Sequence, residues 1–88
     1  MSEQLILNDG TVLDGRIIDN GDNLTIFVYL KGMSLDAGYL LMRNPNKTSR
    51  IIFQSYGVEH VYNGYTEITN VNSEFGNCNL TMRKVVSA

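Results

Sequence analysis

Turn-forming dipeptides recur along this chain, and their spacing constrains its fold more than any other feature. Early in the sequence they stand about ten residues apart, with β-branched and aromatic runs between them. The turn signals are Asn8-Asp9-Gly10, Asn20-Gly21, Lys31-Gly32, Asn63-Gly64 and Gly76-Asn77. This rhythm predicts an all-β fold of about six to seven short antiparallel strands, whose meander hairpins form a small barrel or a two-layer sandwich, with at most one short helical turn. At 88 residues the chain is long enough for one small domain, spanning residues 1–88.

The first three predicted strands, within residues 4–30, form a meander. A two-residue turn at Asn20-Gly21 pairs Ile17 with Leu24, but it sets Asp19 against Asp22, which favours a four-residue loop instead. The longer loop moves each partner by two residues and leaves every side chain on the same face. The facing of this hairpin is therefore predicted more firmly than its register.

A second apolar face is expected on the same meander. A turn at Asp9-Gly10 places Leu7 beside Val12, on the face opposite the main core. That face is more apolar than a solvent-exposed face should be, so either the rest of the domain or another protein covers it. The residues predicted to contact a partner there are Leu5, Leu7, Val12, Phe27 and Tyr29.

The C-terminal segment is predicted to form a second hairpin, with one polar face exposed to solvent and one apolar face toward the core. A type II′ turn at Gly76-Asn77 sets Ser73 against Leu80 and places Cys78 on the apolar face as a small buried residue. The alternation slips toward the strand starts, which predicts either a β-bulge around Thr69-Asn70 or a twist into a second layer.

The middle of the chain gives weaker signals. Alternation and then a continuous apolar run predict a strand over 34–42. Asn44 followed by Pro45 predicts a single helical turn, because Asn caps helix N-termini and Pro favours the first helical position. A strand is expected over 50–56, and the spacing of apolar residues over 58–64 fits one helical turn or a crossing loop.

Catalytic, cofactor and metal signatures are not evident, so we expect no enzyme, no cofactor and no metal site. The chain carries one cysteine and one histidine, too few soft ligands for a structural zinc site. The acidic stretch 19–23 lacks the ligand spacing of a calcium loop and reads as a hairpin turn. No apolar segment is long enough for a signal peptide or a membrane span, and the single cysteine suits a reducing compartment.

The formal charge of −2 makes nucleic acid an unfavoured partner. Acidic residues outnumber basic ones in the first forty residues, and basic residues outnumber acidic ones in the remainder. This asymmetry is either uninformative, a weakly basic face, or an attraction between neighbouring copies in a head-to-tail assembly.

Four segments of the chain resemble small uncharacterised proteins encoded in phages and prophages of gut Firmicutes. These segments are Leu7 to Gly15, Asn44 to Ile51, Val61 to Glu67 and Leu80 to Lys84. The shared motifs are turns and strand edges and include no catalytic signature. The resemblance implies a phage-encoded product near virion structural genes, located in the bacterial cytoplasm or in a virion, and implies no mechanism.

Together these observations predict a non-enzymatic structural or protein-interaction protein. We expect a self-associating virion or tail accessory component whose partners are copies of itself or other phage structural proteins. The alternative is a monomeric, host-directed module that binds a bacterial protein or single-stranded nucleic acid.

Overall fold

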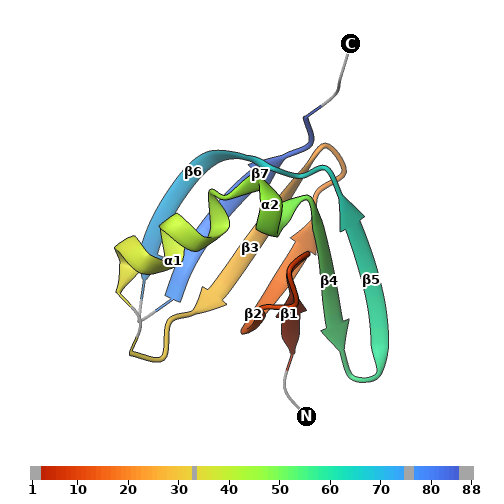
Figure 1. Cartoon of the computed structure of the whole chain (residues 1–88), viewed down its shortest axis with the longest axis horizontal. Coiled ribbons are helices and arrows are strands. Elements are labelled where there is room, and N and C mark those ends of the chain that lie inside the picture. The colour runs from red at the N-terminus through yellow and green to blue at the C-terminus, as the bar shows by residue number, and fades with distance from the viewer. Residues whose placement is uncertain (1–2, 33, 75–76, 86–88) are drawn as a thin grey trace.

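The computed structural model describes residues 3–32, 34–74 and 77–85 and confirms the all-β prediction. Seven antiparallel strands form one sheet in the order β5-β4-β1-β2-β3-β7-β6, which curls into a half-barrel (Figure 1). The strands are β1 (Gln4–Ile6), β2 (Val12–Asp19), β3 (Asn23–Tyr29), β4 (Arg50–Ser55), β5 (Val58–Asn63), β6 (Glu67–Glu74) and β7 (Asn77–Arg83). Two short helices, α1 (Leu35–Met42) and α2 (Pro45–Thr48), connect β3 to β4.

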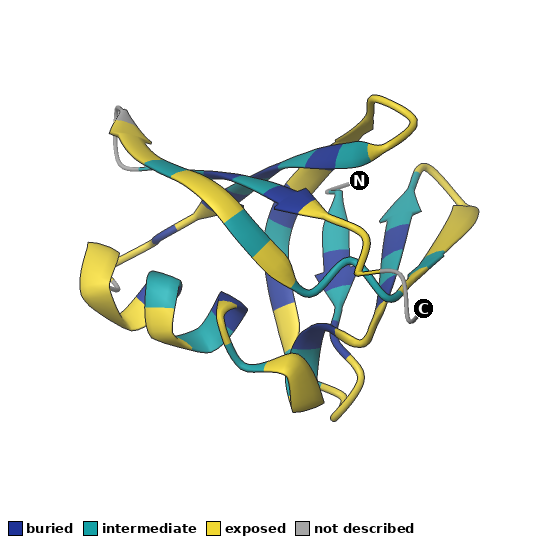
Figure 2. Cartoon of the chain, turned by 90° about the horizontal axis from the view of Figure 1, so that it is seen from above, coloured by how far each residue is buried: buried dark blue, intermediate teal, exposed yellow. Residues whose placement is uncertain are grey.

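The core lies on the hollow side of this sheet. The helices cross that side, with α1 against β7 and α2 against β4 (Figure 2). Most buried apolar residues come from strands that alternate between core and exterior, as expected for a sheet with one covered face, and Met42 comes from α1. They are Leu5, Leu7, Leu13, Ile17, Leu24, Ile26, Val28, Leu30, Met42, Ile51, Phe53, Cys78, Leu80 and Met82.

The sheet changes partners along β2. The first half of β2 pairs with β1, and from Gly15 onward it pairs with β3. The backbone of β3 leaves no room for a side chain at Gly15, because a Cβ atom there would lie only 2.2 Å from the carbonyl oxygen of Phe27. A glycine in a strand interior commonly marks such a close approach or a bend. One wing of the sheet, β5-β4-β1 with the start of β2, therefore begins here.

The loop between β2 and β3 takes the longer of the two expected forms. Asp19 pairs with Leu24 and Ile17 with Ile26, so four residues lie between the paired positions Asp19 and Leu24, and the predicted facing is retained.

The register between β1 and β2 differs from the prediction by one residue. Leu5 pairs with Leu13 and Ile6 with Val12, and Leu7 N–H donates to the Thr11 carbonyl across a three-residue loop. Gly10, at φ +91°, takes the positive φ that such loops require. Because side chains alternate with period two, this shift moves Leu5 and Leu7 into the core and Ile6 to the exterior. The prediction that Leu5 and Leu7 lie on the second face was wrong.

The C-terminal hairpin contains the predicted β-bulge. The pairing of β6 with β7 shifts between Ile68 and Asn70, which returns Ile68 to the core side opposite Met82. Ser73 pairs with Cys78, two residues from the predicted register, and Cys78 is buried as expected. Phe75 and Gly76, on which the predicted turn depends, lie outside the described residues.

The strand predicted over 34–42 is wrong, because this segment forms α1. Ser34 caps the helix by accepting a 3.1 Å hydrogen bond from Ala37 N–H. Gly38 and Met42, four residues apart, are buried, whereas Leu40 points outward with 58% exposure. A short apolar run of this kind fits strand and helix equally by pattern alone.

The helical turn at Asn44-Pro45 is confirmed as α2, with the Asn44 side chain accepting from Asn46 N–H. The strand predicted after it is also confirmed, as β4.

The helical turn or loop expected over 58–64 is wrong. Tyr56 and Gly57 both have positive φ and form a tight two-residue turn of the type I′ class, so the chain returns along β4 as β5. Because β5 lies at the sheet edge and is mostly exposed, it lacks the alternation that identifies a half-buried strand.

Candidate functional site

Four apolar side chains form a row across the outer, convex face of one wing of the sheet. The strand register places Val61 beside Ile52, Ile52 beside Ile6 and Ile6 beside Val12. Val12 is 55% exposed and Val61 46% exposed, and the two isoleucines between them are half-buried. We call these four residues the convex ladder. A contiguous exposed row of apolar side chains is uncommon on a solvent-facing sheet.

Three more apolar residues extend this face toward β3. Phe27 pairs with Arg16, and Ile18 pairs with Thr25, on the same outer side. Tyr29 follows Val28, the partner of Gly15, and is 38% exposed. Of the five residues predicted to contact a partner, the structure places Val12, Phe27 and Tyr29 on the convex face and Leu5 and Leu7 in the core.

Ion pairs neutralise much of the charge around these residues. Arg16 bonds to Glu3 at 2.9 Å, and Lys31 pairs with Asp14. Hydrogen bonding and charge attraction from Glu3 raise the pKa of Arg16 above its ordinary value. The middle of the convex face therefore combines exposed apolar side chains with internally paired charges, which favours no strongly charged ligand.

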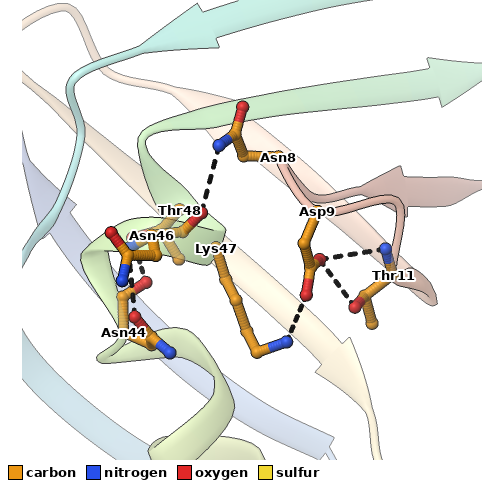
Figure 3. Close-up of polar contacts among 7 residues, drawn as sticks. All are labelled: Asn8, Asp9, Thr11, Asn44, Asn46, Lys47 and Thr48. Atoms are coloured by element: carbon orange, nitrogen blue, oxygen red, sulfur yellow. Dashed lines mark hydrogen bonds and ion pairs between the residues drawn. The ribbon is translucent and has the colours of Figure 1, made fainter.

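A set of polar contacts fixes the loop between β1 and β2, which joins the strands that carry Ile6 and Val12. Asn8 N–H and its side-chain amide donate to the carbonyls of Lys47 and Asn46, at 2.8 and 3.1 Å, near the C-terminal end of α2. Asp9 accepts from the Thr11 hydroxyl at 2.7 Å and pairs with the Lys47 ammonium (Figure 3). We call these contacts the α2 clasp. Terminal helix carbonyls lack partners within their own helix, so Asn8 supplies bonds that α2 needs.

The α2 clasp should make stability depend on acid pH. The hydrogen bond from Lys47, followed by those from Thr11, lowers the pKa of Asp9 well below its ordinary value. A lowered folded-state pKa stabilises the fold above the unfolded value and loses that contribution as the pH falls toward the folded value. We therefore expect Asp9→Asn to lower the urea midpoint at neutral pH and to differ less from the unmodified protein at about pH 2.5. Lys47→Gln should show the same pattern, and a pH-independent difference for both variants would contradict the proposed ion pair.

Sequence reasoning missed Ile6, Ile52 and Val61, which complete the convex ladder. Ile6 was assigned to the other face by the one-residue register error, and Val61 was not placed in a strand. Ile52 joins the row only because β4 pairs with β1, two strands separated by more than forty residues. No local pattern reports a pairing of that kind, so the residue had no sequence signal.

No protein-family model matches the chain. No curated protein and no solved structure matches it significantly either. The function must therefore be argued from the surface itself rather than from relatives.

The metal-ligating side chains of the described part of the chain do not gather into a metal-binding group. Within residues 3–32, 34–74 and 77–85, no three His, Cys, Asp or Glu side chains are placed to hold a metal ion. His60 stacks on Phe53 with ring centroids 6.2 Å apart, and burial raises the pKa of the Cys78 thiol, which disfavours the reactive thiolate. No helix in the described ranges is long and apolar enough to cross a membrane.

Proposed function

We propose that this chain is a non-enzymatic structural or protein-interaction protein that self-associates through the convex face. The observation that carries the proposal is the convex ladder, whose end residues Val12 and Val61 are each about half exposed although their neighbours across the sheet are apolar. Covering such a row removes apolar area from water, which stabilises the assembly by about 25 cal/mol for each Å² of apolar surface buried.

A second copy of the chain fits this face better than a charged partner does. The basic side chains Arg16 and Lys31 are already paired with carboxylates of the same chain, and Arg50 and Glu59 on this face carry opposite charges. The face therefore offers little net charge for nucleic acid. Homo-oligomers with two-fold symmetry bury the same patch on both subunits, which an uncharged apolar row can satisfy by itself. The resemblance to phage-encoded proteins supports a virion or tail accessory setting for such an assembly.

A charged residue at the end of the convex ladder should weaken the assembly without damaging the fold. In Val12→Lys the ammonium can stay in water in the single chain, because position 12 is 55% exposed, but it must be desolvated when a second copy covers it. We expect the association constant to fall at least about tenfold, which corresponds to about 1.4 kcal/mol. Light scattering coupled to size exclusion measures this as a lower mass at equal protein concentration.

The matched control is Leu40→Lys, because Leu40 is exposed to a similar extent, 58%, but lies on α1, away from the convex face. It should keep the mass of the unmodified protein. A second face variant, Val61→Lys, guards against an unfolded first variant, and circular dichroism verifies the fold. Folded Val12→Lys and Val61→Lys proteins that keep the unmodified mass would overturn the proposal.

A further inference from the structure

The two edges of the sheet differ in how well they can accept another strand. β5 forms one edge and β6 the other, and within the described residues neither has a second strand neighbour. The β6 edge contains the bulge between Ile68 and Asn70, and such irregularities discourage pairing. In contrast, β5 pairs with β4 in an uninterrupted register and is exposed at nearly every position.

The direction of the β5 backbone groups follows from the turn that precedes it. Ser55 and Val58 flank a two-residue turn and therefore form a hydrogen-bonded pair, and at the other end Gly64 N–H donates to the Ser49 carbonyl at 2.9 Å. Because hydrogen-bonded pairs alternate along a hairpin, residues 58, 60 and 62 face β4. The N–H and C=O groups of Glu59, Val61 and Asn63 consequently point away from the sheet.

Side chains of these same three residues lie on the convex face. Val61 is opposite Ile52, and Glu59 is opposite Gln54, on the side away from the core. The free backbone edge and the end of the convex ladder thus coincide at Val61.

From this coincidence we infer that β5 pairs antiparallel with β5 of a second copy, about a two-fold axis at Val61. This inference rests on the proposed self-association and names the contact that begins it. Val61 then faces Val61 of the second copy, Glu59 faces Asn63, and His60 faces Tyr62. The convex ladders of the two copies join into one continuous apolar row across the dimer, the surface through which dimers associate further.

Other two-fold registers of the same edge are less favourable. Centring the axis on Glu59 sets two carboxylates directly opposite each other, which destabilises a strand pair. Centring it on His60 places Glu59 opposite Val61 and interrupts the apolar row. Centring it on Asn63 moves most of β5 beyond the overlap with its partner strand. Centring it on Tyr62 sets Val61 opposite Asn63, which also interrupts the apolar row. Of these registers, the one at Val61 alone sets the ends of the two convex ladders directly opposite each other.

A cross-linking experiment tests this register. Opposite residues of an antiparallel hydrogen-bonded pair have Cα atoms about 5.5 Å apart, within the range that a disulfide spans. Under oxidised glutathione, Val61→Cys should therefore form a covalent dimer. The matched control Glu59→Cys should not, because its two copies lie about 13 Å apart along the paired strands. The native Cys78 is buried and should not interfere.

A proline variant tests the edge without changing the convex ladder. Glu59→Pro removes an outward N–H that β4 does not use, so the fold should survive, whereas the edge loses a donor. We expect Glu59→Pro to lower the assembly mass and Glu59→Ala to preserve it.

The outcomes separate this inference from the proposed function. A cross-link in Val61→Cys but not in Glu59→Cys, with a mass loss in Glu59→Pro, supports edge pairing. If Glu59→Cys cross-links, or neither variant does, edge pairing is overturned. In that event a mass loss in Val12→Lys alone would still support association through the face.

Discussion

Replacing Gly15 by alanine is expected to destabilise the fold more than the same replacement at the turn glycines Gly10, Gly21, Gly32, Gly57 and Gly64. The new Cβ would lie 2.2 Å from the Phe27 carbonyl oxygen and 3.2 Å from Leu5 Cδ1. The first neighbour is backbone of β3, held in place by the pairing of β3 with β2 and β7, so it cannot yield as a side chain can. We expect a loss of about 3 kcal/mol or more, a large part of the stability of a domain this size.

Urea unfolding followed by circular dichroism measures this loss. Gly21→Ala is the matched control, because an added Cβ there meets no described atom within 4 Å and only the positive φ of +90° opposes it. Its expected cost is about 1 to 2 kcal/mol. If Gly15→Ala is as stable as Gly21→Ala, the close approach of β3 at Gly15 is refuted.

Truncating Met42 is the second large effect we expect. Met42 is fully buried at the end of α1 and is the helix's main contribution to the core. Alanine is the better helix former, so any loss reflects packing, for which methionine-to-alanine changes cost about 2 to 5 kcal/mol.

Leu40→Ala provides the comparison on the same helix, since Leu40 is 58% exposed and its truncation should change stability by less than about 0.5 kcal/mol. Urea midpoints of the two variants test the helical assignment of residues 35–42 directly. Equal losses would mean that this segment does not bury Met42 in preference to Leu40.

Local turn chemistry predicted the all-β architecture and most side-chain facings. The β2–β3 hairpin kept its facing despite an uncertain loop, because a shift of two residues preserves the side-chain alternation. The β1–β2 hairpin did not, because its three-residue loop shifts the register by one. Asn8-Asp9-Gly10 fits a two-residue or a three-residue loop, and only the pairing of the strands distinguishes them.

Two elements of the middle segment were misassigned for different physical reasons. α1 is so short that its apolar residues do not show a helical period clearly, and its cap at Ser34 was the overlooked signal. β5 is exposed on both sides, and its signal was the turn at Tyr56-Gly57 rather than its own pattern.

The candidate interface was predictable only in part. Val12, Phe27 and Tyr29 could be placed outside the core because β2 and β3 are neighbours in sequence as well as in space. The convex ladder depends instead on β1 inserting between β2 and β4, a non-local pairing that brings Ile6 and Ile52 together.

The absolute mass of the unmodified protein in solution tests the central claim most directly. Light scattering coupled to size exclusion, at two protein concentrations and two salt levels, distinguishes an assembly from the 9.9 kDa chain. We expect an assembly whose mass is a multiple of the chain mass and whose share of the protein rises with concentration. The mass should change little with salt, because the contact is mainly apolar. A mass of one chain under every condition would contradict self-association through the convex face.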